Sequence, residues 1–98
     1  MVTTAGGTAS GAVGVLDDAF GLSLYINSTL TSTAVRVQVE PTDTGTGFVF
    51  LQSGGADVVV TSGTATIISP ITFRQIRLSH SAAEAATVTV PLTKTIIA

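Results

Sequence analysis

The stretch Val35-Arg36-Val37-Gln38-Val39-Glu40 is the most regular part of the chain, and its pattern decides the fold class. Valine occupies every second position, and the residues between the valines are polar or charged. Because successive side chains of a strand point to opposite faces, this pattern predicts a β-strand with one buried face and one wet face. Pro41 ends the strand, since proline cannot donate to a sheet hydrogen bond.

Similar short segments recur along the rest of the chain. Leu22, Leu24 and Ile26 share one face of an expected strand, and Val88 and Val90 share a face of another. Runs rich in β-branched and apolar residues predict five further strands, over residues 13–16, 48–52, 58–61, 64–69 and 71–79.

Turn and helix signals complete the pattern. The pair Ser62-Gly63 predicts a tight hairpin between the strands that flank it. The run 42–47, rich in Thr, Asp and Gly, predicts another turn. The alanine-rich run 82–86 is the only helix-prone segment, and it is too short for more than one turn.

The last long strand changes parity along its length. Ile71 and Phe73 share one face, whereas Ile76 and Leu78 share the opposite face. A slip of one residue would turn the strand inside out. The sequence therefore predicts a β-bulge or a crossover at Arg74-Gln75.

These signals together predict an all-β fold, a single antiparallel β-sandwich of jelly-roll or Ig-like type with seven to nine short strands. Residues 13–98 are expected to form this domain. Residues 1–12, rich in Gly, Thr, Ser and Ala, are expected to be a flexible N-terminal arm, which either frays or orders on a neighbouring subunit. The apolar end 88–98 is expected to pair as a strand, in its own sheet or against a partner.

Charge and cysteine usage exclude several functions. Only ten of the 98 residues are charged, the net charge is -2, and Cys and Trp are absent. No basic patch is available for nucleic acid or anionic lipid, and no thiol is available for a disulfide, a zinc site or a nucleophile. No secretory signal or membrane-spanning segment is expected. Neither a nucleic acid nor a membrane is therefore an expected partner.

No catalytic, metal-binding or cofactor-binding residues are expected. His80 ends a strand and opens the alanine-rich turn, so it is expected to be a solvated turn histidine, and no Gly-x-Ser-x-Gly motif is present. Asp17-Asp18, Asp43 and Asp57 lack the alternating spacing of a calcium loop. The chain is therefore expected not to be an enzyme and to need no cofactor.

Three segments carry a resemblance. A valine strand, a Thr/Asp/Gly turn and an aromatic strand follow one another in 35–51. Ile67-Ile68-Ser69-Pro70-Ile71-Thr72-Phe73-Arg74-Gln75-Ile76-Arg77-Leu78 follows later, and Ala86-Thr87-Val88-Thr89-Val90 closes the set. Over residues 22–91 the chain resembles small β-sandwich virion proteins of tailed bacteriophages, of the capsid decoration (cement) type. The resemblance implies a non-enzymatic structural protein, made in the host cytoplasm, that binds the major capsid protein lattice on the capsid surface and stabilises it, often as a homotrimer.

The expected interface residues come from the arm, from two arginines and from the apolar C-terminus: Val2, Thr3, Thr4, Arg74, Arg77, Ile96 and Ile97. Two alternatives remain. One is a host-attachment or carbohydrate-binding module of a phage fibre, with Phe20, Tyr25 and Phe73 as candidate aromatic contacts, and the other is a tail or connector subunit. Because the expected strands carry so few charges, the chain is expected to work as a homo-oligomer and not as a lone monomer.

Overall fold

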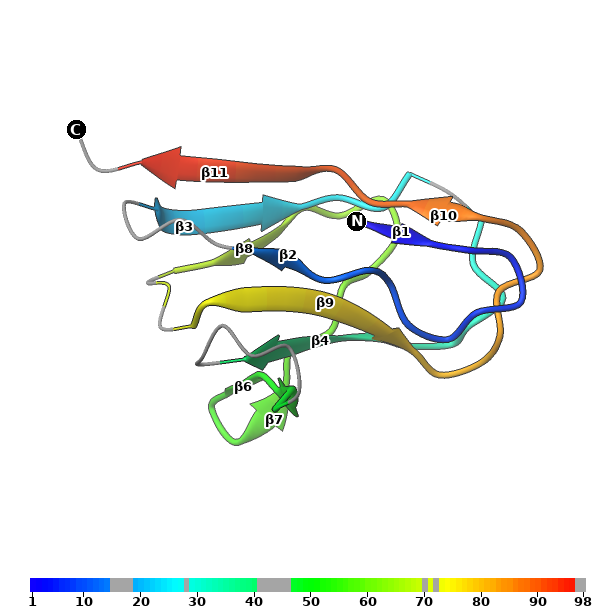
Figure 1. Cartoon of the computed structure of the whole chain (residues 1–98), viewed down its shortest axis with the longest axis horizontal. Coiled ribbons are helices and arrows are strands. Elements are labelled where there is room, and N and C mark those ends of the chain that lie inside the picture. Colours follow the sequence, from blue (N-terminus) through cyan, green and yellow to red (C-terminus); the bar gives the residue numbers. More distant parts are fainter. Residues whose placement is uncertain (15–18, 28, 41–46, 70, 72, 97–98) are drawn as a thin grey trace.

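The computed structural model describes residues 1–14, 19–27, 29–40, 47–69, 71 and 73–96. These residues form strands, turns and bends, with no helix among them, which confirms the predicted all-β class. There are eleven strands, more than the predicted seven to nine, because six of them are only two residues long. In chain order (Figure 1) they are β1 (Val2–Thr3), β2 (Val13–Gly14), β3 (Ala19–Leu24), β4 (Val35–Glu40), β5 (Val49–Phe50), β6 (Gln52–Ser53), β7 (Ala56–Asp57), β8 (Thr66–Ile68), β9 (Gln75–His80), β10 (Val88–Thr89) and β11 (Leu92–Ile96).

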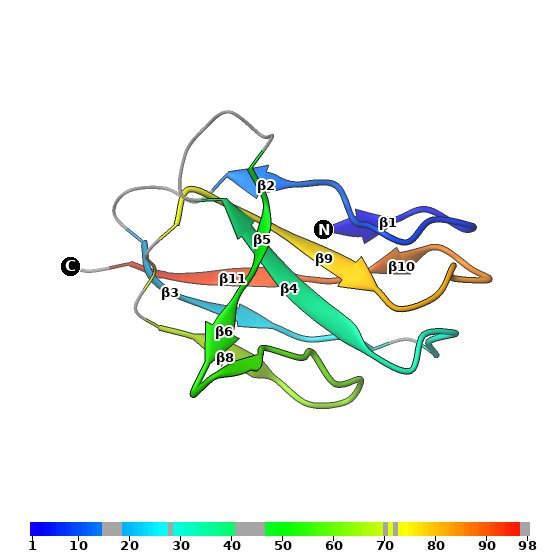
Figure 2. The same cartoon turned by 90° about the horizontal axis from the view of Figure 1, so that it is seen from below.

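The strands pair in four antiparallel sheets. The larger two have the orders β2-β9-β4-β5 and β11-β3-β8, and the smaller two are the pairs β1-β10 and β6-β7. The longest ladder joins β4 to β9, from Val35 opposite His80 to Glu40 opposite Gln75. In Figure 1 β3 and β11 lie above β4 and β9, and Figure 2, seen from below, shows β4 and β9 in one layer that crosses in front of β3 and β11 in another.

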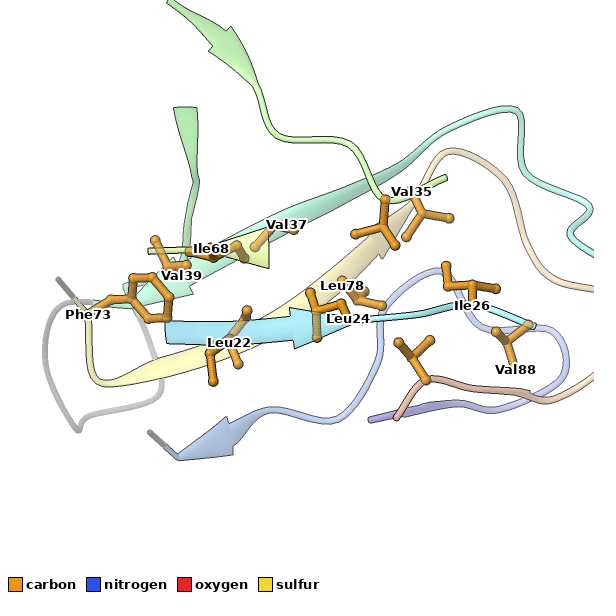
Figure 3. Close-up of a cluster of buried hydrophobic side chains, with 13 residues drawn as sticks. Leu22, Leu24, Ile26, Val35, Val37, Val39, Ile68, Phe73, Leu78 and Val88 are labelled. Atoms are coloured by element: carbon orange, nitrogen blue, oxygen red, sulfur yellow. The ribbon is translucent and has the colours of Figure 1, made fainter. Parts of the chain in front are cut away.

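A single cluster of buried apolar side chains joins the two larger sheets (Figure 3). Val35, Val37 and Val39 are buried and Arg36 and Gln38 between them are half-buried, which confirms the predicted alternation as far as Val39. Glu40, expected on the wet face, is instead 1% exposed. The cluster consists of Leu22, Leu24, Ile26, Val35, Val37, Val39, Val60, Ile68, Phe73, Ile76, Leu78, Val88 and Val90. Each of these side chains contributes about 1.5–3 kcal/mol by leaving water, so the cluster is the main source of stability.

The prediction of a hairpin around Ser62-Gly63 is wrong. The segment before this turn adds to β4, where Val59 lies opposite Arg36, and β8 after the turn pairs with β3 in the other large sheet. The physical reason is that both flanking segments bury a residue in the core, and they do so from different sheets. Val60 belongs to the first segment and Ile68 to the second, and both are buried.

The parity change between Phe73 and Ile76 falls at the beginning of β9. Both residues are buried, but Phe73 precedes the strand, which starts at Gln75. The β4–β9 register runs without a shift, and the Arg74 amide donates to the Glu40 carbonyl at 2.8 Å just before it. The change of parity therefore coincides with the beginning of β9. The β-bulge or crossover predicted at Arg74-Gln75 is not needed to explain it.

The C-terminal end pairs within the chain's own sheet, which was one of the two expectations. Strand β11 runs antiparallel to β3, from Leu92 opposite Leu24 to Ile96 opposite Ala19, with a register shift between Thr95 and Ile96. Val88 and Val90, just before it, are both buried, as their alternation predicts.

Two adjacent residues of β8 test this arrangement. Ile68 is 7% exposed in the core, whereas Ile67 is 75% exposed. Replacing Ile68 by Ala should lower the free energy of unfolding by about 2–4 kcal/mol, because a cavity replaces buried methyl groups. The matched control Ile67→Ala should lower it by less than about 1 kcal/mol. Urea denaturation of both variants measures the difference, and equal losses would contradict the assigned register.

Candidate functional site

The N-terminal segment bridges the two layers. The sequence predicts a flexible arm over 1–12, and in the structure this segment makes backbone hydrogen bonds to both sides of the core. The Met1 ammonium donates to the Val90 carbonyl at 2.9 Å, and the His80 amide donates to the Thr8 carbonyl at 2.7 Å. Strand β1 pairs with β10, and β2 pairs with β9. The segment therefore closes the side of the fold where β2 and β11 form the sheet edges.

Three buried polar side chains lie in a line beneath this segment. The Thr3 hydroxyl lies 2.7 Å from His80 Nε2, and His80 Nδ1 lies 3.0 Å from Glu84 Oε2. Their exposed fractions are 1%, 5% and 1%. Thr3 ends β1, His80 ends β9, and Glu84 lies in the turn that follows. We name Thr3, His80 and Glu84 the buried network.

Glu84 is the hub of the buried network. Its carboxylate accepts hydrogen bonds from the Thr31 amide at 2.7 Å, from the Ser32 amide at 3.1 Å and from the Ser32 hydroxyl. Burial by itself would raise the pKa of Glu84, but these bonds and the one to His80 outweigh it and lower the pKa to about 2. Glu84 is therefore a buried carboxylate at neutral pH, and its charge is held by donors from two distant segments.

The expectation that His80 is a solvated turn residue is wrong. His80 continues the inward parity of Ile76 and Leu78 on β9, so its ring is directed into the fold. That parity, and the four-residue spacing from His80 to Glu84, were visible in the sequence. Sequence reasoning also missed Thr3 as the partner of His80, because 77 positions separate the two residues.

The buried network has the order hydroxyl, imidazole, carboxylate that serine hydrolases use. Nucleophilic attack also needs a substrate in contact with the hydroxyl, and the Thr3 side chain is covered by the fold. The arrangement instead fastens the N-terminal segment to the turn after β9. In the part of the chain that the structure describes, no group of three or more His, Asp or Glu side chains could hold a metal ion. No helix in that part is long and apolar enough to span a membrane.

The predicted interface residues do not form one surface. On the N-terminal segment Val2 and Thr4 are exposed and Thr3 is buried in the network described above. Arg74 is exposed and Arg77 is half-buried, both on the β9 part of the chain. Ile96 ends β11 near the C-terminus, away from β1 (Figure 1), and Ile97 lies outside the described residues.

Arginine stacks on phenylalanine at two places on the outer face of the four-stranded sheet. The Arg77 guanidinium lies 4.2 Å from the Phe48 ring centroid, and its Nε donates to the Gln38 side chain at 2.7 Å. The Arg36 guanidinium lies 6.0 Å from the Phe50 ring centroid. Arg77 therefore contacts Phe48 and Gln38 on this face. The sequence predicted only that Arg77 is an interface residue, without naming the residues that it contacts.

Most of the large exposed apolar side chains lie on or beside the last strands of the two larger sheets. The described residues include six large exposed hydrophobics, and four of them lie on β5, on β8 or on the segment added to β4. Both strands are the last in their sheets, and Ile67 of β8 lines one hollow with Leu51, Gln52 and Ser53, which directly follow β5. We name this surface, made by Val49, Phe50, Val59 and Ile67, the β5–β8 side.

Lowering the pH should weaken the fold through Glu84. The pKa of Glu84 is about 2 in the folded protein and 4.5 ordinarily, so protonation favours the unfolded chain. The stabilisation is complete above about pH 5 and is lost as the pH falls towards 2. Urea titrations from pH 6 to pH 2 should show the wild type more stable than Glu84→Gln at pH 6, with the gap narrowing in acid. A gap that stays constant across this range would contradict the role of the ionised carboxylate.

Two neighbouring threonines test the fastening of the N-terminal segment. Thr3→Val removes the hydroxyl that faces His80, leaves a buried ring nitrogen unsatisfied and should cost about 1–3 kcal/mol of unfolding free energy. Thr4→Val, at an exposed position, should change it by less than about 0.5 kcal/mol. Hydrogen exchange should also quicken at the Gly6 amide, which donates to the Glu84 carbonyl, only in the Thr3 variant. Equal unfolding free energies and equal Gly6 exchange rates in the two variants would contradict the role of Thr3 in holding the N-terminal segment.

Comparison with known proteins gives no relative: no protein-family model, no curated protein and no solved structure matches the chain. Inferences about function accordingly rest on the residues and the geometry of this chain.

Proposed function

We propose that the chain is a non-enzymatic virion structural protein. It binds the major capsid protein lattice on the outer surface of a bacteriophage capsid and stabilises that lattice as a decoration (cement) protein. It acts as a homo-oligomer, such as a homotrimer, without a cofactor, a nucleic acid or a membrane. In this proposal the two larger sheets form a single antiparallel β-sandwich of jelly-roll or Ig-like type.

The observation that carries the assembly role is the β5–β8 side. Val49, Phe50 and Val59 are each about half exposed, and Ile67 is three-quarters exposed. They lie beside strand edges that form no further sheet pairing among the described residues. Soluble proteins usually protect such edges with charges, prolines or covering loops, and gathered exposed apolar side chains are typical of interaction surfaces. Coverage of this side by other protein is therefore the favourable state.

The viral part of the proposal is supported by the sequence resemblance over residues 22–91. The low charge agrees with it, because ten charged residues in 98 produce little repulsion between closely spaced copies. Many weak contacts on a repeating lattice add up through multivalency, so each contact can be small. The chemistry required of the chain is binding alone.

Stabilisation would operate by mass action. A protein that binds the assembled shell, and not the dissociated subunits, stabilises the shell by about 2.7 kcal/mol per site at one hundred times its dissociation constant. The decoration protein therefore needs only a folded surface that fits the capsid lattice and allows neighbouring copies to bind side by side.

The alternative of a carbohydrate-binding module has less support. Such a site needs exposed aromatic rings grouped in a hollow. Of its three candidates, Tyr25 is exposed, Phe73 is buried in the core, and the side chain of Phe20 lies outside the described residues.

Heating capsids with and without the protein tests the proposal. DNA-free capsids of the virus that encodes the chain should melt at a temperature that rises with added protein and levels off when the sites are full. The increase should be smaller with Phe50→Ser, on the β5–β8 side, than with Tyr25→Ser, an aromatic residue of similar exposure that follows β3. Capsids that melt at the same temperature with and without the protein would overturn the proposal.

A further inference from the structure

The outer edge of β8 has no strand partner among the described residues. Within the described residues β8 pairs only with β3, through Leu22 opposite Ile68 and Leu24 opposite Thr66. At its centre Ile67 is 75% exposed, the highest value among the exposed large hydrophobics. The edge therefore offers both unpaired backbone groups and apolar surface.

No charge protects this edge. Residues 58–69 contain no charged side chain, and the one charged residue in 47–69 is Asp57. Asp57 is neutralised by Arg36, whose Nε lies 3.4 Å from its carboxylate. Charges are the commonest device that keeps one edge strand from pairing with another. The absence of charged side chains matters most for pairing between identical copies, because a charged edge strand would repel the same strand of a second copy.

From these observations we infer that β8 is a self-association site, where the partner is a second copy of this chain. Two copies pair their β8 edges antiparallel about a two-fold axis at Ile67. Ile67 then faces Ile67 of the second copy, and Thr66 faces its Ile68. Antiparallel pairing of a strand with itself is self-complementary, as a two-fold interface requires, and facing β-branched residues stabilise each other.

This inference deepens the proposed function, on which its biological role rests, because it names the surface through which copies of the protein meet. The contact is small, since a three-residue strand buries less area than a stable dimer needs. The free protein should therefore form a weak, concentration-dependent dimer, and neighbouring contacts on a lattice would strengthen it.

Sedimentation velocity over roughly 5 µM to 1 mM protein tests the inference. The wild type should shift from monomer to dimer across this range. Ile67→Lys places like charges opposite each other and should weaken dimerisation about tenfold or more. Thr89→Lys, which adds the same charge at an exposed residue of β10, should leave it unchanged. A wild type that stays monomeric throughout, or equal effects of the two variants, would overturn the inference.

Cross-linking gives a second readout that does not depend on a tight dimer. The chain has no cysteine, so Ile67→Cys introduces a single thiol. Facing residues of an antiparallel pair have their Cβ atoms about 4.5–5.5 Å apart, close enough for a disulfide. Mild oxidation should link Ile67→Cys into dimers many times faster than Thr89→Cys, at an exposed position of β10, and equal rates would contradict the contact.

The two proposals fail in different ways. A wild type that is monomeric but still raises the capsid melting temperature would refute the β8 contact and leave capsid binding standing. If Ile67→Lys then also lost capsid binding, a strand of the capsid protein would be the occupant of the edge. A β8-dependent dimer that leaves capsid melting unchanged would support the inference and refute the decoration role.

Discussion

The inward-facing side chains of β4 and β9 cannot remain in water, and the architecture follows from covering them. Val35, Val37 and Val39 line one side of β4, and Ile76 and Leu78 line the same face of β9. The cover comes from β3 and β8, whose own apolar residues face the opposite way. Because the two larger sheets are short and share one core, this core has two open sides. The N-terminal segment covers one of them, and the other has no such cover among the described residues.

One side is closed by the chain itself. The N-terminal segment pairs with β10 and then with β9, and the buried network fastens it by the contacts of Thr3, His80 and Glu84. A buried carboxylate is tolerated only because amides and hydroxyls satisfy it, and these donors come from Thr31 and Ser32. Closure of this side therefore explains why Thr3, His80 and Glu84 are buried. The β5–β8 side has no such cover among the described residues, and there the exposed apolar residues gather.

Local periodicity predicted the parts of the fold that depend on one segment at a time. The alternation at 35–40 and at 88–90 placed the buried valines correctly. Strand partners were less predictable, because Val60 and Ile68 look alike in sequence yet cover the core from different sheets. The exposure of Ile67 was also invisible, since two adjacent isoleucines carry no alternation. The buried network joins residues up to 77 positions apart, so only the folded chain brings it together.

We propose that other protein covers the β5–β8 side. Hydrogen exchange measured at low and at high protein concentration tests it most directly, because unpaired strand-edge amides exchange quickly until another chain pairs with them. The account predicts that exchange slows at high concentration in a peptide that covers β8, and that exchange in peptides from β1 and β10 stays constant. Unchanged exchange at β8, or protection that appears at β1 and β10 instead, would contradict the account.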